Sequence, residues 1–387
     1  MSAAEAGFAE WKQTGTWERA AKIRKVADLI RERLDTIATI MSIETGKPLA
    51  EAKGETNGAA DQFEWYSEET KRIYGQLIGS RTHDSRLAVI YQPVGVVAAF
   101  SAWNFPAILP ARKIAAALSA GCSVIIKPAG EAPGSCALIV QACHDAGIPK
   151  GVVNFVTGNS SMIAKHLISS PVVRKVSVTG SVPVGKEILH LAADGVKKVS
   201  MELGGHGPVI VFEDADAEKA AEVCAGTKFR NCGQVCISPT RFYVHEARYD
   251  AFAAKFAQVA KSIKVGRGMD EGTQMGPMAN ARGLDTIKTM VADAVNKGAE
   301  ILAGGQPPKD FNRGFYYEPT VLGRVPDDAM VMTEEPFGPI APLTTFTEYD
   351  DVMTRANSLP FGLAGYLFTH DLGTATRASE DMEVGMV

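Results

Sequence analysis

The 387-residue sequence predicts an α/β fold with two parallel-sheet domains and a β-hairpin arm. Short apolar runs alternate with helical patterns, as they do in βαβ units, whose strands pair in parallel. A second alternating series follows the first one, and the two series meet near Gly204 and Gly205. The chain is also longer than a typical single hydrophobic core requires, so two domains are the default expectation.

The region before the first strands is predicted to be helical. Apolar residues recur at three- and four-residue steps across residues 17–44, which predicts one amphipathic helix. Gly46 and Pro48 are expected to end this helix. Residues 82–98 are rich in β-forming residues and have polar flanks, which predicts a hairpin arm that leaves the main sheet.

The two alternating series define the expected strands and helices. In the first series the strands are 94–100, 123–127, 152–156, 175–178 and 208–212, and the helices are 108–120, 135–145, 163–168 and 186–193. In the second series the strands are 241–245 and 340–346, and the helices are 249–262 and 284–297. We therefore assign residues 1–81 and 99–204 to one domain, 82–98 to the arm and 205–387 to the other domain.

Composition excludes several classes of function. The chain is 46% hydrophobic and 22% charged, with a formal net charge of -4, so it lacks the basic surface of a nucleic-acid partner. No apolar run approaches the ~20 residues of a membrane helix. The N-terminus lacks the pattern of a signal peptide, which points to a cytosolic location. The apolar ending at 383–387 suggests that the natural chain continues.

The six cysteines are few for this length, and none are paired as CxxC, so neither a disulfide framework nor a zinc site is predicted. They are Cys122, Cys136, Cys143, Cys224, Cys232 and Cys236. Five lie in helical or strand patterns and are interpreted as buried packing residues. Cys236 instead follows a helix in a loop rich in Gly, Gln, Ser and Pro, where it is either a nucleophile or a structural thiol.

A glycine-rich turn at residues 180–185 follows a strand and precedes a helix, and it nearly matches a P-loop. Glu187 stands where a P-loop needs a hydroxyl for magnesium, and a carboxylate there would repel phosphate. A turn that places a helix N-terminus beside an anion, such as a dinucleotide pyrophosphate, fits better. A purely structural turn is the alternative, and no strict GxGxxG follows any strand.

Three more polar residues follow predicted strands. Glu202 precedes two glycines and is either a general base or a surface carboxylate. Asn104 and Lys127 each close a strand of the first series, at the edge where ligands bind in open α/β sheets. An Asn amide there can stabilise an oxyanion, and a Lys can meet phosphate or ribose oxygens or can simply be solvated.

The ordered set of short motifs resembles the aldehyde dehydrogenase superfamily, and in it the succinate-semialdehyde dehydrogenases most of all. The matching stretches are WNFP at 103–106, KP at 127–128, GSVPVG at 180–185, ELGG at 202–205, GQVC at 233–236 and EEPFGP at 334–339. The resemblance implies two Rossmann-like domains, one for the cofactor and one catalytic. It also implies that the hairpin serves oligomerisation, as a homodimer or homotetramer, and that the chain is cut at both ends.

The resemblance further implies a catalytic set. Cys236 would attack the aldehyde carbon, and the Asn104 amide together with the Cys236 N–H would hold the oxyanion. Glu202 matches the family's general base, which activates water to hydrolyse a thioester. Ser238 stands where some succinic-semialdehyde enzymes carry a second cysteine, so no redox-switch disulfide is expected.

The cofactor expected from the resemblance is NAD or NADP. The matching positions are Trp103, Asn104, Lys127, Gly130, Gly180, Ser181, Gly185, Leu203, Glu335 and Phe337. Glu335 would bind the nicotinamide ribose. Many NAD-preferring relatives carry Glu where this chain has Gly130, and losing that carboxylate removes repulsion toward a 2′-phosphate. Both cofactors therefore remain open.

The expected partner is a small-molecule aldehyde. Arg112 lies eight residues after Asn104, and Arg230 lies six residues before Cys236. In having an arginine at each of these two positions, the chain resembles succinic-semialdehyde dehydrogenases. Guanidinium groups match carboxylates, although either arginine could form a structural salt bridge instead. Alternatives are 2-oxoglutaric semialdehyde as substrate, a non-catalytic dinucleotide-binding member and a P-loop phosphotransferase.

Overall fold

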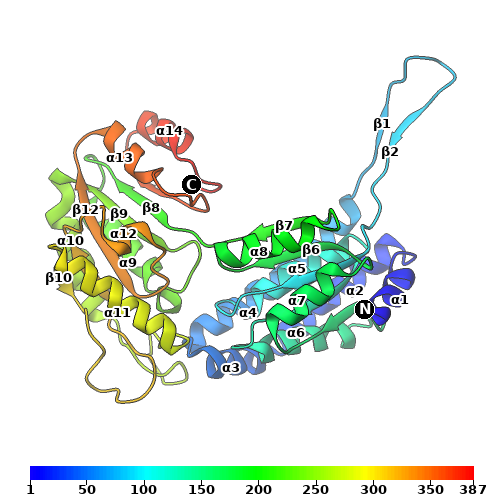
Figure 1. Ribbon diagram of the computed structural model, residues 1–387, viewed down its shortest axis with the longest axis horizontal. Helices are drawn as coiled ribbons and strands as arrows, with labels where there is room; N and C mark the ends of the chain where they lie inside the picture. Colours follow the sequence, from blue (N-terminus) through cyan, green and yellow to red (C-terminus); the bar gives the residue numbers. More distant parts are fainter. The chain divides into compact units, whose positions relative to one another are not determined.

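The computed structural model describes all residues 1–387, which divide into two compact units. The first unit contains residues 1–44 and 52–202, and the second contains 45–51 and 203–387. The predicted α/β class is confirmed, with a parallel sheet in each unit (Figure 1). The units part between Glu202 and Leu203, two residues before the expected boundary. No sequence pattern indicates that residues 45–51 belong to the second unit.

The first unit is built on a five-stranded parallel sheet. Its strands, in spatial order, are β5 (Val153–Phe155), β4 (Ser123–Lys127), β3 (Val96–Phe100), β6 (Val173–Thr179) and β7 (Lys198–Glu202). The chain builds outward from β3 through β4 to β5 and then crosses to the other side of β3. The topological switch point therefore lies between β3 and β6, where open α/β sheets bind ligands outside the carboxyl ends of their strands.

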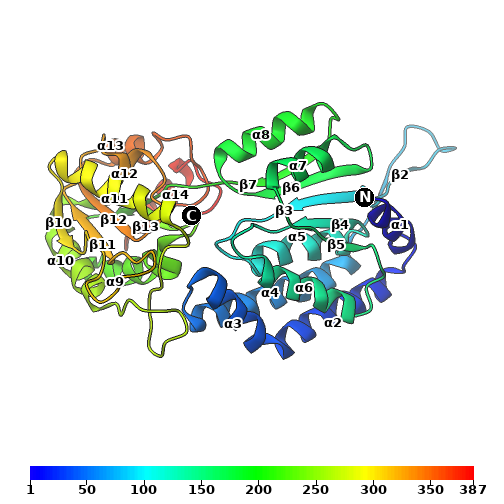
Figure 2. The same cartoon turned by 60° about the horizontal axis from the view of Figure 1, so that its bottom comes forward.

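Helices cover both faces of this sheet (Figure 2). One layer contains α2 (Thr16–Glu32), α5 (Ile108–Ser119) and α6 (Pro133–Asp145), and the other contains α1 (Ser2–Trp11), α7 (Ser160–Ser169) and α8 (Val182–Ala193). Covering both faces buries the inner strands completely, which explains their continuous apolar runs. The remaining helices are α3 (Leu34–Thr45), α4 (Leu49–Glu69) and the short η1 (Thr70–Arg72).

The expectation of one helix across residues 17–44 is wrong. The helical pattern is shared by α2 and α3, which are separated at Arg33 with φ -101° and ψ 14°. The Arg33 side chain bonds Asp145 at 2.7 Å, so a tertiary ion pair lies at the break. The expected stop is present, because Gly46 follows α3 with φ +76°, a backbone conformation that glycine adopts at little cost.

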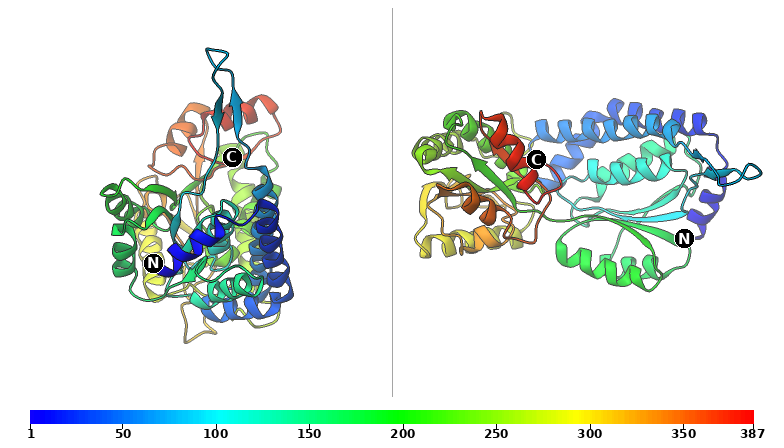
Figure 3. Two further views of the ribbon diagram at one scale, coloured as in Figure 1. Left: turned by 90° about the vertical axis from the view of Figure 1, so that its right-hand side faces the viewer. Right: turned by 90° about the horizontal axis from the view of Figure 1, so that it is seen from above.

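The hairpin arm projects from the first unit (Figures 1 and 3). Its antiparallel strands are β1 (Gln76–Ile78) and β2 (Leu87–Val89), so the arm begins before the expected residue 82. Its expected end is also displaced, because residues 96–98 pair within β3 of the central sheet. The sequence is rich in strand-forming residues from the arm into β3. Only the pairing in the folded chain, β2 with β1 and β3 with β4 and β6, shows where the arm ends and the sheet begins.

The second unit is built on a six-stranded sheet. Its strands, in spatial order, are β10 (Glu300–Ala303), β11 (Thr320–Gly323), β12 (Ile340–Phe346), β9 (Pro239–His245), β8 (Gly207–Val211) and β13 (Tyr366–Phe368). Only the pair β10–β11 is antiparallel. Its helices are α9 (Ala217–Lys228), η2 (Arg230–Gly233), α10 (Glu246–Ser262), α11 (Ala281–Asn296), α12 (Met330–Thr333), α13 (Tyr349–Ala356) and α14 (Leu372–Asp381).

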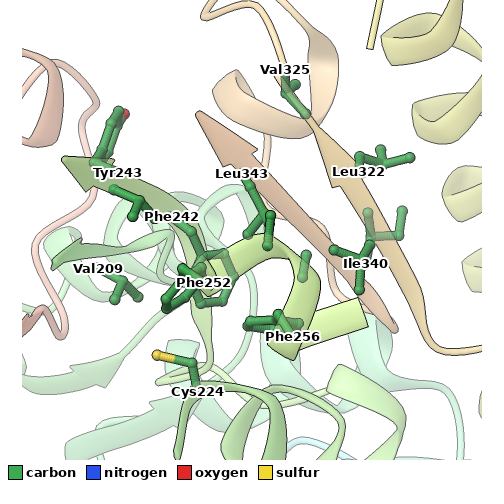
Figure 4. Packing of buried hydrophobic residues seen from close by; sticks show 14 of the residues in the cluster. Val209, Cys224, Phe242, Tyr243, Phe252, Phe256, Leu322, Val325, Ile340 and Leu343 are labelled. Carbon is green, nitrogen blue, oxygen red and sulfur yellow. The ribbon is translucent and has the colours of Figure 1, made fainter. Parts of the chain in front are cut away.

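An aromatic cluster holds α10 against this sheet (Figure 4). Phe252 and Phe256 lie one helical turn apart on α10, and the Phe256 ring contacts that of Phe242 on β9 with centroids 5.1 Å apart. All three side chains are fully buried. Truncating one buried phenylalanine typically lowers the free energy of unfolding by ~3–5 kcal/mol, so this cluster contributes strongly to the stability of the second unit.

Candidate active site

The loop between β3 and α5 carries Asn104 at the carboxyl end of the central strand. Asn104 is buried within the first unit. The Glu55 carboxylate of α4 accepts hydrogen bonds from the N–H groups of Ala107 (2.9 Å) and Ile108 (3.3 Å). A carboxylate at a helix N-terminus satisfies unpaired N–H groups and complements the helix dipole. Glu55 therefore fixes the start of α5 and the end of the Asn104 loop.

Glu202 ends β7 and lines a groove of about 430 Å³ within the first unit. Arg112, Lys113 and Lys175 also line this groove, so three cations share it with one carboxylate. The Lys113 ammonium donates to Ser177 Oγ at 3.1 Å. Burial lowers the pKa of Lys113 to about 8, while Glu202 opposes the shift and the other two cations add to it. Sequence reasoning identified Arg112 and Glu202 here but missed Lys113.

Three predicted cofactor residues lie at the edge formed by the carboxyl ends of β4 and β6. Lys127 ends β4, is buried, and donates a hydrogen bond to Ser160 at the start of α7. Burial lowers the pKa of Lys127, and the Glu131 carboxylate opposes this effect. Gly180 follows β6, and Ser181 is the N-cap residue of α8 with no side-chain capping bond. The N–H groups in the first turn of α8 therefore have no side-chain acceptor from the cap residue. A helix N-terminus that binds an anion needs its N–H groups available in this way.

One orphaned polar atom marks the switch point itself. Ser101 follows β3 directly, and its hydroxyl oxygen is buried with no hydrogen-bond partner. A buried hydroxyl without a partner is costly, and such groups call for an explanation in a missing ligand or water. The residues of this edge therefore fit a dinucleotide, with a cation, a helix N-terminus and an unsatisfied hydroxyl around the carboxyl ends of β3, β4 and β6.

The remaining predicted cofactor residues of the first unit lie in the Asn104 loop, beyond Lys127 and in α8. Trp103 is half-buried in the Asn104 loop, Gly130 is exposed beyond Lys127, and Gly185 is buried in the first turns of α8. The Gly185 N–H bonds the Ser181 carbonyl at 2.9 Å, which continues the helix from its cap.

The second unit carries Cys236 in a tight turn before β9. The Ser238 N–H donates to the Val235 carbonyl at 3.0 Å, which places Cys236 and Ile237 at the two central positions of a β-turn. Cys236 is half-buried, whereas the other five cysteines are buried. The thiol at the turn is therefore the one that a small aldehyde can reach most easily.

The backbone before this turn is strained. Asn231, Cys232 and Gly233 take φ values of 50°, 56° and 70°, so three successive residues are left-handed. A non-glycine residue in this region costs roughly 1–2 kcal/mol, and such strain gathers at functional sites. The Glu51 carboxylate accepts the Asn231 N–H at 2.9 Å, which gives residues 45–51 a role in supporting this backbone.

Two further contacts hold the cysteine loop. Gln234 accepts the Ala279 N–H at 2.9 Å through Oε1 and donates to the Asn231 carbonyl at 3.0 Å through Nε2. The Tyr366 hydroxyl of β13 donates to the Ile237 carbonyl. The loop is thus attached on both sides of Cys236 to elements that are distant in sequence.

Two glycines allow the cysteine loop and Glu335 to approach each other. A Cβ at Gly205 would lie 2.6 Å from the Cys236 carbonyl oxygen, and one at Gly204 would lie 2.5 Å from Glu335 Oε2. The Gly205 N–H donates to Glu335 Oε1 at 3.1 Å. Burial raises the pKa of Glu335 to about 7, opposed by this hydrogen bond and by Lys228. The predicted residues Cys236 and Glu335 are therefore brought together around Gly204 and Gly205.

Other predicted residues of the second unit lie on the same segments. Leu203 is half-buried as the first residue after β7, and Phe337 is half-buried in the turn that begins at Glu335. Arg230 is exposed at the start of η2, where its charge lowers the pKa of Tyr366 against the raising effect of burial. Arg112 and Arg230 belong to different units.

Lys228 is a buried residue of this site that sequence reasoning missed. It ends α9, has 0% exposure, and its ammonium lies 3.5 Å from Ser238 Oγ. The sequence did contain a pattern that points to its burial, because Ala221, Cys224, Ala225 and Lys228 follow helical spacing on one apolar face.

The structure contains no helix long and apolar enough to cross a membrane, and no cluster of three side chains suited to a metal ion.

The parallel sheets and the strand edge that fits a dinucleotide define the class of a dinucleotide-binding α/β protein, here with a half-buried thiol in a turn. The sequence profile described as the aldehyde dehydrogenase family matches residues 1–387, and the chain belongs to this family. It is therefore an oxidoreductase that acts on aldehydes with NAD or NADP. This membership excludes the phosphotransferase alternative.

Three similar proteins illustrate the relationship. The glutarate-semialdehyde dehydrogenase of Pseudomonas putida is 43% identical over 100% of this chain and 80% of its own length. The NADP-dependent succinate-semialdehyde dehydrogenase of Escherichia coli K12 has the same identity and coverage. A crystal structure of an NADP-dependent E. coli enzyme superposes with a TM-score of 0.98, at 43% identity, over 100% of this chain and 80% of that one.

The contact of Gly205 with the Cys236 carbonyl predicts a steric sensitivity. Gly205→Ala should displace the cysteine turn, and kcat for aldehyde oxidation should fall about 100-fold, because misplacement by ~1 Å has effects of that size. The matched control is Gly226→Ala in α9, where a Cβ meets nothing within 4 Å. The control should keep its activity and gain roughly 0.5–1 kcal/mol of stability. Equal kcat in the two variants would contradict the steric argument.

Proposed function

We propose that this enzyme oxidises a short aldehyde with a distal carboxylate, succinic semialdehyde first of all, to the dicarboxylic acid. The observation that carries the substrate class is the cationic groove around Glu202, with Arg112, Lys113 and Lys175 on its walls. Arg230, six residues before Cys236 in the other unit, adds a fourth cation tied to the reaction centre by sequence. Guanidinium groups bind carboxylates through paired, charge-assisted hydrogen bonds.

In the proposed reaction Cys236 is the nucleophile. After the thiol has given its proton to water, its sulfur forms a bond to the aldehyde carbon while the carbonyl π electrons move to oxygen, and the product is a thiohemiacetal oxyanion. The half-buried position in the β-turn and the strained backbone before it favour this role over that of a fully buried packing thiol. The other five cysteines are buried, and burial raises the pKa of all five thiols.

Asn104 is proposed as an oxyanion donor, together with the Cys236 N–H. An amide donor held in place before the reaction is worth about 3–4 kcal/mol of transition-state stabilisation. The support that Glu55 gives to the end of the Asn104 loop keeps that donor preorganised. Loss of hydride from the thiohemiacetal carbon then leaves a thioester on Cys236.

The nicotinamide ring of bound NAD or NADP supplies the acceptor for that hydride. Lys127, Ser181 and Ser101 are proposed to hold the dinucleotide at the edge of the first sheet, and Glu335 to accept hydroxyl groups of its nicotinamide ribose. Trp103, Gly130, Gly180, Gly185, Leu203 and Phe337 complete the proposed set.

Glu202 is proposed as the base of the hydrolytic step. It removes a proton from water, whose oxygen bonds to the thioester carbon while the carbon–sulfur bond breaks. The products are the carboxylate and the restored Cys236 thiol. Glu202 shares its groove with Arg112, Lys113 and Lys175, so the surroundings of the proposed base are polar and cationic.

Two other substrates share the proposed recognition. Glutaric semialdehyde is one carbon longer than succinic semialdehyde, and 2-oxoglutaric semialdehyde also ends in a carboxylate. The relatives from P. putida and E. coli are named for the five-carbon and the four-carbon semialdehyde, at the same identity. One methylene typically changes specificity by only 10–200-fold, so the carboxylate rather than the chain length is the firm part of this proposal.

A homo-oligomer is proposed on the basis of the hairpin arm. Leu77 and Ile90 are 87% and 72% exposed, and strands β1 and β2 have free outer edges. Exposed apolar edges are pairing surfaces that proteins normally cover. The arm is too small to bury these residues itself, so another copy of the chain is the proposed cover. A cytosolic location stays a prediction.

Two variants separate the chemical steps. Cys236→Ala should abolish aldehyde oxidation and keep dinucleotide binding, because only the covalent step is lost. Glu202→Gln should release one equivalent of reduced cofactor in a burst and then stall as a thioester, because only hydrolysis needs the base. Stopped-flow absorbance and intact-protein mass spectrometry measure the burst and the acylated chain. Full turnover by Cys236→Ala, or loss of the burst in Glu202→Gln, would refute the assigned roles.

Removal of either arginine tests the substrate class. Arg112→Ala and Arg230→Ala should each lower kcat/KM for succinic semialdehyde about 10- to 100-fold, because a charge-assisted hydrogen bond is worth roughly 1.5–3 kcal/mol. Butanal, which lacks the carboxylate, should be oxidised almost as before. The exposed Arg313 provides the matched control, and Arg313→Ala should change neither rate. Wild-type enzyme without a preference for the carboxylated aldehyde would refute this substrate class, and retained preference in both variants would refute the arginine roles.

Introducing negative charges on the arm tests whether it mediates oligomerisation. The double variant Leu77→Asp and Ile90→Asp should dissociate the assembly, because each carboxylate would have to be buried at the interface. Size-exclusion chromatography with light scattering measures the mass. The control is Val196→Asp, at an apolar position that is 91% exposed elsewhere on the first unit. A wild-type mass of one chain would contradict the proposal.

A further inference from the structure

A tyrosine of β13 contacts the cysteine turn, and no step of the proposed mechanism uses this contact. The Tyr366 hydroxyl donates a hydrogen bond to the carbonyl oxygen of Ile237. Cys236 and Ile237 are the two central residues of the β-turn that precedes β9. Tyr366 and Ile237 are 129 positions apart in the chain, so only the folded sheet brings this donor to the turn.

The neighbouring strand fixes the place of the tyrosine. β13 pairs in parallel with β8, and Tyr366 lies opposite Val209 in that pairing. A Cβ at Gly207 would lie 3.5 Å from Tyr366 Cε2 and 3.0 Å from the carbonyl oxygens of Ala364 and Ser238. The absence of a side chain at Gly207 therefore leaves room for the tyrosine ring beside the end of the turn. Burial raises the pKa of Tyr366, so its hydroxyl keeps its proton near neutral pH and acts as a donor.

The hydrogen bonds of the turn continue from this tyrosine toward the nucleophile. The Ile237 carbonyl and the Ser238 N–H belong to one peptide group, and that N–H donates to the Val235 carbonyl at 3.0 Å. The Val235 carbonyl and the Cys236 N–H belong to another peptide group. Two peptide groups therefore connect the tyrosine hydroxyl to the Cys236 N–H. Hydrogen bonds in such a chain polarise one another, and each strengthens the next by about 10–30%.

We propose that Tyr366 is a positioning residue that polarises this chain and so strengthens the Cys236 N–H as an oxyanion donor. The proposal rests on the proposed function, in which that N–H holds the oxyanion formed when the sulfur adds to a carbonyl carbon. A peptide group whose oxygen accepts a hydrogen bond carries more positive charge on its N–H. The stronger donor acts mainly on the charge that develops during the reaction, so it lowers the barrier more than it tightens substrate binding.

The size of the effect is limited by what one donor contributes. An oxyanion donor typically accelerates a reaction about 100- to 1,000-fold. If 10–30% of that effect, on a logarithmic scale, depends on Tyr366, loss of its hydroxyl should slow oxyanion formation about 2- to 8-fold. A reaction of the same sulfur that forms no oxyanion should keep its rate. A tyrosine that only held the turn in place would affect both reactions.

The test compares two reagents that react with the same thiol. With p-nitrophenyl acetate the sulfur bonds to the ester carbon and the carbonyl electrons move to oxygen, before nitrophenolate leaves. With iodoacetamide the sulfur displaces iodide, and no oxyanion forms. Rates measured with Cys236→Ala are subtracted, so that only the reaction of this thiol is compared.

The first variant removes only the hydroxyl. Tyr366→Phe should slow acylation by p-nitrophenyl acetate about 2- to 8-fold and leave alkylation by iodoacetamide at the wild-type rate. Tyr349→Phe is the matched control in the same unit, because it also loses one tyrosine hydrogen bond, the 2.7 Å bond to Asp381. The control should change neither rate.

The second variant keeps the hydrogen bond and changes its strength. 3-Fluorotyrosine in place of Tyr366, introduced by genetic code expansion, has a more acidic hydroxyl and is therefore a stronger donor while it stays protonated. Acylation should be faster than in the wild-type protein, and alkylation should again be unchanged. The shape of the side chain is nearly preserved, so this comparison decides the matter even if Tyr366→Phe folds poorly.

Two results would overturn the proposal. One is an equal slowing of acylation and alkylation in Tyr366→Phe, because it would mean that the turn is displaced. The other is an acylation rate that does not follow the acidity of the hydroxyl. Neither reagent is an aldehyde or needs a dinucleotide, so an error in the proposed substrate would leave these results unchanged. Full acylation of Cys236→Ala would instead refute the nucleophile of the proposed function, and this proposal with it.

Discussion

The contact that the second unit depends on most is the one between Gly205 and the Cys236 carbonyl. No side chain fits between them, since even a methyl group would lie 2.6 Å from that oxygen. The same closeness recurs at Gly233, where a Cβ would lie 2.0 Å from the Gly338 carbonyl oxygen. Backbone therefore packs against backbone on both sides of the cysteine turn, and the position of the sulfur is set by main-chain atoms rather than by adaptable side chains.

That arrangement explains why the strain in the loop is tolerated. Asn231 and Cys232 are left-handed, and they could relax if the loop were free. Hydrogen bonds with Glu51, Ala279 and Tyr366, which lie outside the loop, instead hold it in place. A turn held this firmly loses little further freedom when a substrate reacts, which is how preorganisation lowers a barrier.

Much of this organisation could be predicted from the sequence, because it depends on local patterns. Alternating apolar runs predicted β3, β4, β5 and β6 of the first sheet and β9 and β12 of the second, whereas β8, expected in the first series, belongs to the second sheet. Polar residues at or soon after strand ends indicated Asn104, Lys127 and Glu202 as candidates. Side chains that act through tertiary burial could not be predicted in this way. Lys113 has an ordinary position on a helix, and only the folded groove places it beside Glu202. The break at Arg33 has the same origin, because it lies at an ion pair with Asp145, 112 positions away in the chain.

Both units place a lysine of a helix against a serine hydroxyl. In the first, Lys113 of α5 donates to Ser177 of β6 at 3.1 Å, and in the second, the fully buried Lys228 of α9 lies 3.5 Å from Ser238 before β9. Burial lowers the pKa of Lys113 to about 8 and that of Lys228 to about 7, because an ammonium group loses its hydration when it leaves water. The hydroxyl acceptor offsets part of that loss, since a buried ammonium without any partner would be far more costly. Neither lysine belongs to a local motif, so each could be recognised only once the fold had brought its helix against the serine.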